Sequence, residues 1–348
     1  MPEAGKATIY SVAERAQVSI ATVSRVLSGA NRVSSGSRDR VLAAVRELDY
    51  IPDRAARSLV AKRHQALGLV LPELGGYYYP ELLTGFESLA AERRMSVILT
   101  VVAAGSDVEA SLAELCSRVD AVAVMDGAGT LAPVQLRALS RRTPLVVIGG
   151  APDRPAAITT SSRENARLLT AHLLDHGRTR PIFAGSPELA ADAAARWQGF
   201  QDALRERGLR VPPPQPSGFD AAEGAQIGGR ITSGELDCDA VVCVNDEVAL
   251  GLCLALRRHG LSVGEQIAVT GWDDAPATRY TTPGITTVAQ PVRELGRAAA
   301  VRLLDLIDGR TAETPLELPT RIVLRGSCGC PDTPPWAIGP GGPTKESS

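Results

Sequence analysis

Val18-Ser-Ile-Ala-Thr-Val-Ser-Arg-Val-Leu27 has the pattern of a short amphipathic helix. Val23, Val26 and Leu27 recur at helical spacing, so they predict the buried side of this helix. Ser19 stands where a serine oxygen can accept a hydrogen bond from a backbone N–H of the first turn. The stretch therefore predicts a capped helix that packs against the protein on one side only.

The outward side of this helix carries small and polar side chains. Ala21 and Arg25 point away from the apolar stripe, Ile20 lies in the first turn, and Thr22 and Ser24 flank them. Small side chains let a helix approach the floor of the DNA major groove closely, and an arginine can donate two hydrogen bonds to a guanine edge. The same pattern would also suit a three-helix bundle with a solvated face, and both interpretations stay open on this helix alone.

Apolar stripes on either side predict two further helices. One stripe precedes the turn at Gln17-Val18-Ser19 and the other follows the central helix: Val12, Ala13 and Ala16, then Val41, Ala44, Val45 and Leu48. A helix, a short turn and a capped helix form a helix-turn-helix candidate. Pro52 disfavours helical geometry in the residue before it, so the third helix is expected to end near Ile51.

The charge of the chain is divided unevenly. Residues 1–63 hold 11 Lys and Arg against six Asp and Glu, a net charge of +5, whereas the rest holds 26 against 33, a net charge of −7. No acidic residue occurs between Val18 and Ser37. A basic module on an acidic body indicates a polyanionic partner at one end of the protein. This distribution favours the DNA-binding interpretation over the solvated bundle.

From Ala66 onward, short apolar runs alternate with stretches of helical period. The runs are Leu67–Leu71, Ala121–Met125, Leu145–Ile148, Pro181–Ala184, Ala240–Val244 and Ile267–Thr270. Strands without polar alternation, separated by helices, predict parallel sheets covered on both faces. Their number suits two doubly wound lobes, with a ligand in the cleft at the carboxyl ends of the strands.

The N-terminal motifs resemble those of a known family. Thr8-Ile-Tyr-Ser-Val-Ala13, followed by the stretch from Val18 to Leu27, closely resembles the headpiece of the LacI family, and the similarity continues to about Gly329. The resemblance implies an all-α helix-turn-helix headpiece followed by an α/β, two-lobed, periplasmic-binding-protein-like domain with doubly wound parallel sheets. The expected divisions are a headpiece at 7–51, a hinge helix and linker at 52–64, an effector-binding domain at 65–330 (lobe 1 about 65–159 and 288–319, lobe 2 about 160–287 and 320–330) and a disordered tail at 331–348.

The resemblance also implies which residues touch DNA. Ile20 and Ala21 occupy positions that vary with the operator, Arg25 is a base contact, and Leu59 of the hinge wedges into the minor groove. The full expected set is Thr8, Tyr10, Ser19, Ile20, Ala21, Thr22, Ser24, Arg25, Ser34, Ser37 and Leu59. Gln17 departs from the family, because a glycine is usual in this turn, and it is expected to strain the turn if the position needs a positive φ angle.

A second set of residues is expected to bind the effector. By the same resemblance it consists of Tyr78, Tyr79, Arg196, Phe219, Asn245, Asp273 and Gln290. Asn245 and Asp273 follow apolar strands, where they could equally cap the next segment. Gly149 lies where many members carry an aspartate, and Ser161-Ser162 replaces an Asp-Asn pair. The loss of these acidic contacts argues against the usual hexose. The effector is expected to be a sugar or sugar derivative, with a phosphorylated sugar and another small polar molecule as alternatives.

Two further motifs do not form a complete metal site in the sequence. His172 and His176 lie four apart on a predicted helix but show no third metal ligand, and Cys328-Gly-Cys330 lies near the tail without a partner pair. The six cysteines are scattered along the chain, and we expect them to be reduced thiols. We expect no metal, no cofactor and no enzymatic activity.

The sequence is compatible with two functions. The first is a cytoplasmic, nucleoid-associated transcriptional repressor that binds a pseudo-palindromic operator as a homodimer, with no membrane partner. The second is a solute-binding or sugar-metabolising protein with a degenerate headpiece. The lack of an apolar signal segment at the N-terminus argues against export, and salt-dependent binding to a palindromic DNA fragment would separate the two.

Overall fold

The computed structural model describes residues 7–27, 33–50, 64–102, 107–127, 133–150, 156–310 and 314–331. The chain divides into two units, one ending at His64 and the other beginning at Gln65. Leu59, nearly all of the expected hinge and nearly all of the expected tail lie outside the described residues. None of the described helices is long and apolar enough to span a membrane.

The first unit is a bundle of three helices. They are α1 (Ile9–Arg15), α2 (Ile20–Leu27) and α3 (Ser35–Glu47). All three predicted stripes contribute to one apolar core, whose buried members are Val12, Ala13, Ala16, Val23, Val26, Val41 and Ala44. Helix α3 ends before the predicted position, because Asp49 turns the chain with a positive φ of 46°. The helix-turn-helix prediction is confirmed.

Hydroxyl side chains cap each of these helices. Thr8 and Ser11 form a reciprocal capping box at the start of α1. Ser19 Oγ accepts a hydrogen bond from Thr22 N at 3.2 Å, which confirms the predicted cap of α2. Ser34 Oγ accepts from Ser37 N at 3.4 Å at the start of α3. Because no acidic side chain occupies any of the three first turns, the positive ends of these helices are not neutralised locally.

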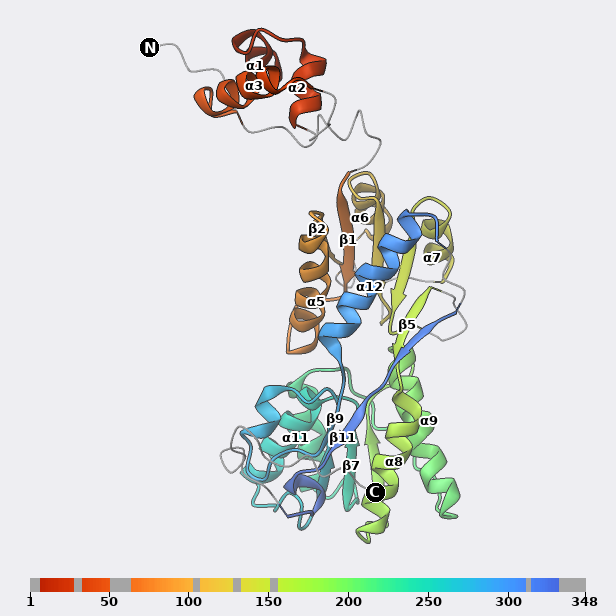
Figure 1. The fold of residues 1–348 in the computed structure, drawn as a ribbon. Helices are drawn as coiled ribbons and strands as arrows, with labels where there is room; N and C mark the ends of the chain where they lie inside the picture. The colour runs from red at the N-terminus through yellow and green to blue at the C-terminus, as the bar shows by residue number, and fades with distance from the viewer. Residues whose placement is uncertain are drawn as a thin grey trace, which may run out of the picture. The chain divides into compact units, whose positions relative to one another are not determined.

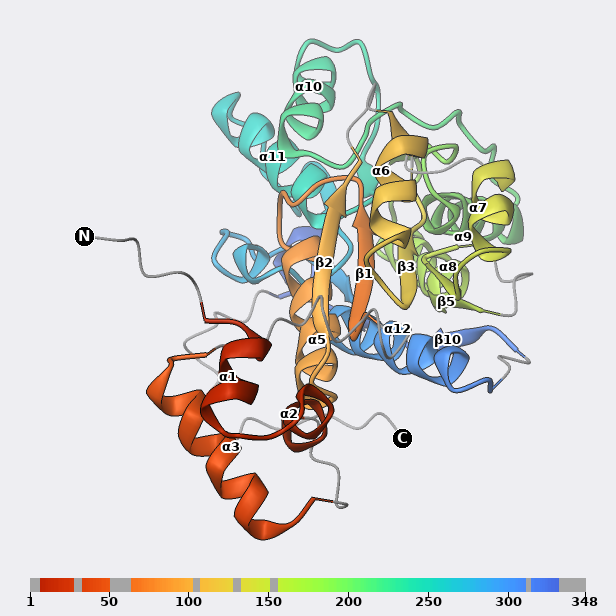
Figure 2. The same ribbon diagram turned by 90° about the horizontal axis from the view of Figure 1, so that it is seen from above.

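The second unit contains a six-stranded sheet with the strand order β10-β5-β4-β3-β1-β2, in which every pairing is parallel. The strands are β1 (Ala66–Leu71), β2 (Ser96–Val101), β3 (Ala121–Met125), β4 (Leu145–Ile148), β5 (Ala157–Thr160) and β10 (Leu316–Leu318). Helices cover both faces of this sheet: α5 (Tyr78–Glu92) and α12 (Val292–Ile307) on one side, α6 (Val108–Cys116) and α7 (Pro133–Ser140) on the other (Figure 2).

Strand β1 shows why helices cover both faces of the sheet. Leu67, Leu69 and Leu71 pack with residues of α5 and α12, whereas Ala66 and Val70 pack with residues of α6 and α7. Alternate side chains of a strand point to opposite faces, so an uninterrupted apolar run needs a cover on each face. Burial of this run therefore gives a central strand between two helical layers.

A second sheet with the order β6-β7-β8 forms the other lobe of this unit (Figure 1). Its strands are β6 (Pro181–Ala184), β7 (Ala240–Cys243) and β8 (Ala268–Thr270), and the surrounding helices are α8 (Ser162–Asp175), α9 (Ala191–Glu206), α10 (Ala221–Thr232) and α11 (Asp246–Arg258). All six apolar runs predicted from the sequence are strands, each within one residue of its predicted bounds. The predicted fold class is confirmed.

The chain passes between the two lobes three times, and the passages are joined by hydrogen bonds. Strands β9 (Thr287–Ala289) and β11 (Arg321–Val323) pair antiparallel next to the crossovers. Thr160 Oγ1 donates to Gln290 Oε1 at 2.7 Å, which ties the first passage to the second. Thr320 N donates to Ser161 Oγ at 3.0 Å, which ties the third passage to the first. The lobes are thus connected by a compact set of strands.

Candidate functional site

Helix α2 presents the predicted outward face to solvent. Ile20, Ala21 and Arg25 are exposed, and Ile20 keeps 41% of its accessible surface although it is apolar. Val23 and Val26 are buried on the opposite side. Such a face combines an arginine, which can donate two hydrogen bonds to a guanine edge, with small or apolar side chains that can contact a thymine methyl group.

The other expected DNA contacts surround the starts of the headpiece helices. Thr8 and Ser34 are exposed cap residues, Ser37 is half-buried, and Tyr10 keeps 68% of its surface exposed. Thr22 and Ser24 flank the outward face of α2 and are half-buried. Backbone N–H groups at a helix start attract phosphate, so the uncharged first turns of α2 and α3 suit a DNA backbone.

Both lobes of the second unit line one cavity of about 410 Å³. Its described lining residues are Pro72, Glu73, Gly75, Gly76, Tyr77, Tyr78, Tyr79, Met125, Asp126, Gly127, Gly149, Ala190, Asp192, Arg196, Gly218, Phe219, Asp220, Glu223, Asn245, Asp246, Glu247, Asp273 and Ala275. The volume falls within the range of roughly 300–1,000 Å³ that is usual for small-molecule sites. Six of the seven expected effector residues are brought together here, and Gln290 is not among the lining residues.

Arg196 is the only cationic side chain among the described lining residues. It projects from α9 and is only 5% exposed. Its Nη1 donates to the Val244 carbonyl at 2.7 Å, its Cζ lies 4.7 Å from the Trp272 ring centroid, and its Nη2 lies 3.8 Å from Asp192 Oδ2. Its Nε is buried without a partner among the described residues. The guanidinium is therefore fixed in place with one donor still to be satisfied.

Tyr78 offers a second unpaired polar group in the cavity. Its hydroxyl is buried and has no hydrogen-bond partner within the described part of the chain. Burial raises the pKa of this phenol, and the carboxylates of Asp192 and Asp273 raise it further. A neutral hydroxyl that faces a cavity can both donate and accept, as recognition of a polar ligand requires.

Gln290 acts on the cavity through Asp273. Its Nε2 donates to Asp273 Oδ1 at 2.6 Å, while its Oε1 accepts from Thr160. Gln290 therefore does not line the cavity itself but holds the Asp273 carboxyl group, which does, to the lobe crossover. It is a positioning residue in this geometry.

Asn245 is occupied by structural hydrogen bonds. Its Oδ1 accepts from Val248 N at 3.0 Å and caps α11, and its Nδ2 donates to the Phe219 carbonyl at 2.8 Å. The sequence left open whether this residue caps a helix or meets the ligand. In the structure Asn245 both caps the helix and lies in the cavity wall. Its hydrogen bond to the Phe219 carbonyl also holds the backbone that carries the Phe219 ring beside the cavity.

The cavity is acidic. Eight of its described lining residues are Asp or Glu. Burial raises the pKa of Asp192 to about 6, with Arg196 acting in the opposite direction and Asp126 adding to the rise. Burial likewise raises the pKa of Asp273 to about 7, against the opposing effects of Arg196 and the Gln290 hydrogen bond. These carboxyl groups can therefore accept or donate hydrogen bonds near neutral pH.

Asp126 and Asp192 were missed by the sequence analysis. Asp126 directly follows β3, and the strand-end rule that selected Asn245 and Asp273 would have found it. Asp192 lies four residues before Arg196 on α9, a spacing that places both side chains on one helix face. A Cβ at Gly149 would lie 3.5 Å from Asp192 Oδ2, so lobe 2 supplies a carboxylate beside the place where the sequence lacks one.

Comparisons with known proteins agree with both units. Residues 8–53 match the bacterial regulatory proteins of the lacI family, and residues 170–328 match the periplasmic binding protein-like domain. The HTH-type transcriptional repressor PurR of Pasteurella multocida (strain Pm70) is 30% identical over 328 residues, which cover 92% of this chain and 98% of PurR. The chain belongs to the LacI family.

Solved structures of LacI-family proteins resemble this chain over most of its length. The lac repressor dimer bound to operator and the anti-inducer ONPF has a TM-score of 0.84 at 28% identity and covers 92% of this chain and 99% of its own. A complex of the transcriptional regulator CelR with cellobiose has a TM-score of 0.68 at 27% identity, with the same coverage. This LacI-family protein is a DNA-binding transcriptional regulator of the repressor type and not an enzyme.

Proposed function

We propose that this LacI-family protein binds a pseudo-palindromic operator as a homodimer and that a neutral or cationic sugar-like effector in the interlobe cavity changes its affinity for that DNA. The observation that carries the proposal is the cavity itself. It holds two buried polar groups, the Tyr78 hydroxyl and Arg196 Nε, that lack partners in the described protein. Because leaving a polar group buried and unpaired is costly, a bound ligand is the natural partner.

The headpiece supports the DNA part of the proposal. The face formed by Ile20, Ala21 and Arg25 would enter the major groove, with the starts of α2 and α3 against the phosphates. Leu59 would contribute the minor-groove wedge that the family resemblance implies. Such a regulator would act in the cytoplasm on the nucleoid.

The exposed edge of the large sheet supports a homodimer. Strand β2 is the last strand of the sheet, and its apolar side chains are only half-buried, with Val101 44% exposed. An apolar edge strand is a liability unless another surface covers it. A second copy of the chain would cover it, and a two-fold pair of headpieces would match two half-sites.

The chemistry of the cavity supports an uncharged or cationic polyhydroxy effector. Carboxylates accept hydrogen bonds from sugar hydroxyls, and Tyr78 and Tyr79 can pack against an apolar sugar face. A phosphorylated sugar fits poorly, because Arg196, the one guanidinium among the described lining residues, faces many carboxylates and already binds the Val244 carbonyl. The similar regulator CelR forms a complex with cellobiose, which supports a sugar as the effector.

The test has two stages. Thermal shift of the full chain with neutral sugars, amino sugars and sugar phosphates should show stabilisation by members of the first two groups only. Fluorescence anisotropy with a genomic operator fragment should then give an affinity that falls with salt and changes with the stabilising sugar.

Arg196→Met tests the cavity without removing the buried aliphatic stem. It should abolish the response to the sugar while leaving the affinity for operator within about twofold of wild type. Arg205→Met is the matched control, since Arg205 lies on the same helix but is exposed and contacts Asp202 at 3.6 Å. An undiminished response in Arg196→Met, or stabilisation by sugar phosphates alone, would overturn the proposed effector site.

A further inference from the structure

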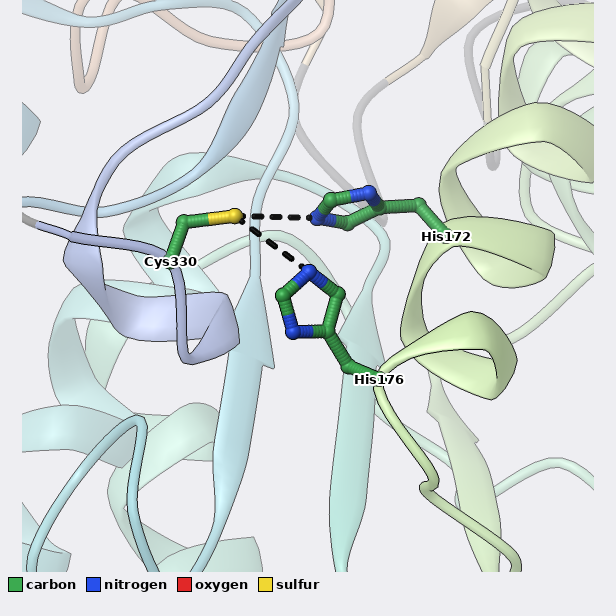
Figure 3. Close-up of side chains that lie close together, drawn as sticks. All are labelled: His172, His176 and Cys330. Atoms are coloured by element: carbon green, nitrogen blue, oxygen red, sulfur yellow. Dashed lines mark hydrogen bonds between the residues drawn. The ribbon is translucent and has the colours of Figure 1, made fainter.

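Two motifs far apart in the sequence meet at the end of helix α8. His172 lies in the last turn of α8 and His176 is the residue that ends it, while Cys330 follows the short helix η2 (Gly326–Cys328). The Sγ of Cys330 lies 3.5 Å from His172 Nε2 and 3.4 Å from His176 Nε2 (Figure 3). All three ligand atoms lie within 4.8 Å of one another. The third ligand that the histidine pair lacked in the sequence is therefore supplied by the fold.

We propose that His172, His176 and Cys330 bind a zinc ion that ties the C-terminal segment of the second unit to helix α8. Imidazole nitrogen and thiolate sulfur are the donors that Zn²⁺ prefers, and three protein ligands leave a fourth position for water. This zinc site is separate from the effector cavity, because none of its three ligands is among the residues that line the cavity.

The spacing of the ligand atoms fits such an ion. With Zn–N near 2.0 Å and Zn–S near 2.3 Å, tetrahedral geometry places a nitrogen and a sulfur ligand about 3.5 Å from each other. The two observed distances, 3.5 and 3.4 Å, are close to that separation. The two imidazole rings lie 4.5 Å apart between centroids, so both can turn a nitrogen toward one point.

The backbone prepares this arrangement from both sides. His172 and His176 are one helical turn apart, which places both rings on one side of the helix end. The C-terminus of a helix carries a partial negative charge and favours a cation. On the other side, Gly329 adopts a φ of 102°, which turns the chain between Cys328 and Cys330. A side chain is disfavoured there, because a Cβ would lie 3.1 Å from the Gly264 carbonyl oxygen.

Cys328 is close to the cluster but is engaged elsewhere. Its Sγ lies 3.4 Å from His172 Nε2, yet its thiol donates to the Arg325 carbonyl at 3.2 Å and the residue is fully buried. His172, His176 and Cys330 are instead partly or fully exposed, so an ion can reach them. This difference assigns Cys330 as the sulfur ligand and makes Cys328 the natural control.

The position of the cluster predicts a structural role. It lies beside Gly264, which precedes β8, and Arg178, which precedes β6, and so beyond the amino ends of these strands. The effector cavity is built at the opposite, carboxyl ends, by Asn245 and Asp273. We expect zinc to stabilise the second unit without changing the affinity for the effector.

The experiment uses the full chain, purified without a histidine tag and freed of metal with a chelator. Zn²⁺ titrated against a chromophoric chelator should bind with one ion per chain and raise the thermal unfolding temperature. Co²⁺ in place of Zn²⁺ should give a near-ultraviolet charge-transfer band from a cobalt–sulfur bond. Cys330→Ser should abolish that band, and both Cys330→Ser and His176→Asn should weaken Zn²⁺ binding at least tenfold, roughly the loss that even outer-shell changes can cause.

Cys328→Ser and Cys116→Ser serve as controls and should retain the band and the affinity. Absence of stoichiometric Zn²⁺ binding by the wild type would overturn the proposal and leave only thiol–imidazole hydrogen bonds at this place. An equal loss in Cys328→Ser and Cys330→Ser would overturn the assigned ligand set. Circular dichroism of each variant separates loss of a ligand from loss of the fold.

Discussion

Asp273 gives the cavity a dependence on pH that can be measured through stability. Burial raises its folded-state pKa to about 7, whereas an exposed aspartate has a pKa of about 3.9. Between these values the folded protein keeps a proton that the unfolded chain has released. The free energy of unfolding contributed by this residue therefore falls as the pH rises from about 4 to about 7, by at most about 1.4 kcal/mol per pH unit.

Asp273→Asn removes this titration while keeping an oxygen that can accept from Gln290. The variant should gain stability relative to wild type as the pH rises through that window, and urea denaturation of both proteins at a series of pH values measures the difference. Asp192→Asn should likewise gain stability relative to wild type as the pH rises, but only up to about pH 6, because burial raises the pKa of Asp192 to about 6. A difference that stays constant between pH 4 and 7 would contradict the argument.

At the scale of elements, the turn of the helix-turn-helix contains a residue in an unfavourable conformation. Gln17 has a φ of 51°, and the next residue closes the helix end, since Val18 N donates to the Ala13 carbonyl at 3.0 Å. This is the type of helix end at which glycine is usual, because a side chain is disfavoured at positive φ. The strain that the sequence predicted only conditionally is present in the structure.

Gln17→Gly should therefore stabilise the headpiece by about 1 kcal/mol. Thermal unfolding of the full chain, monitored by a spectroscopic signal from the headpiece, would show a higher unfolding temperature for that unit. Glu14→Gly is the matched control: it lies within α1, where glycine should destabilise by about 1 kcal/mol. A destabilised Gln17→Gly would mean that the glutamine side chain makes a contact worth more than the backbone strain.

The elements that the sequence predicted well share one property. Each of the six predicted strands is a run of consecutive apolar residues that is buried on both faces of a parallel sheet, as in Ala121–Met125. Most of the missed strands lack that property: β2 and β10 are partly exposed, and β9 and β11 have three residues each and depend on pairing across a lobe crossover. Strand β5 is fully buried, but half of its four residues are threonines, so it does not stand out as an apolar run. No local pattern encodes such pairing, since its partners are far apart in the sequence.

The candidate sites divide in the same way. Six effector residues that follow the family motifs line the cavity, and Ser19 caps its helix as its position predicted. Two arrangements could not be predicted: the bond that holds Gln290 behind Asp273, and the meeting of Cys330 with a histidine pair set aside as incomplete. Both depend on contacts between residues of distant segments, which spacing along the chain does not reveal.

At the scale of the whole molecule, the geometry of the lobes suggests how an effector signal would be carried. The cavity has walls from both lobes, and Asp126 Oδ2 of one lobe accepts from Ala191 N of the other at 3.4 Å. A ligand between these walls changes the free energy of one lobe arrangement relative to another. The three crossover segments between the lobes are joined by the hydrogen bonds of Gln290 and Thr320, so a change in lobe arrangement would have to act through this connected set.

Coupling between operator and effector must then be reciprocal. The factor by which effector changes the operator Kd should equal the factor by which operator changes the effector Kd, with a size of about 5- to 150-fold. Anisotropy with labelled operator gives the first factor and calorimetry with the sugar gives the second. If neither ligand changed the Kd of the other, so that both factors were one, the proposed coupling between the cavity and the headpiece would be wrong.

Leu59→Ala is expected to weaken operator binding while leaving the effector Kd of DNA-free protein unchanged, because the family resemblance places this residue among the DNA contacts and not among the effector contacts. An operator affinity equal to that of the wild type would contradict the proposed minor-groove wedge.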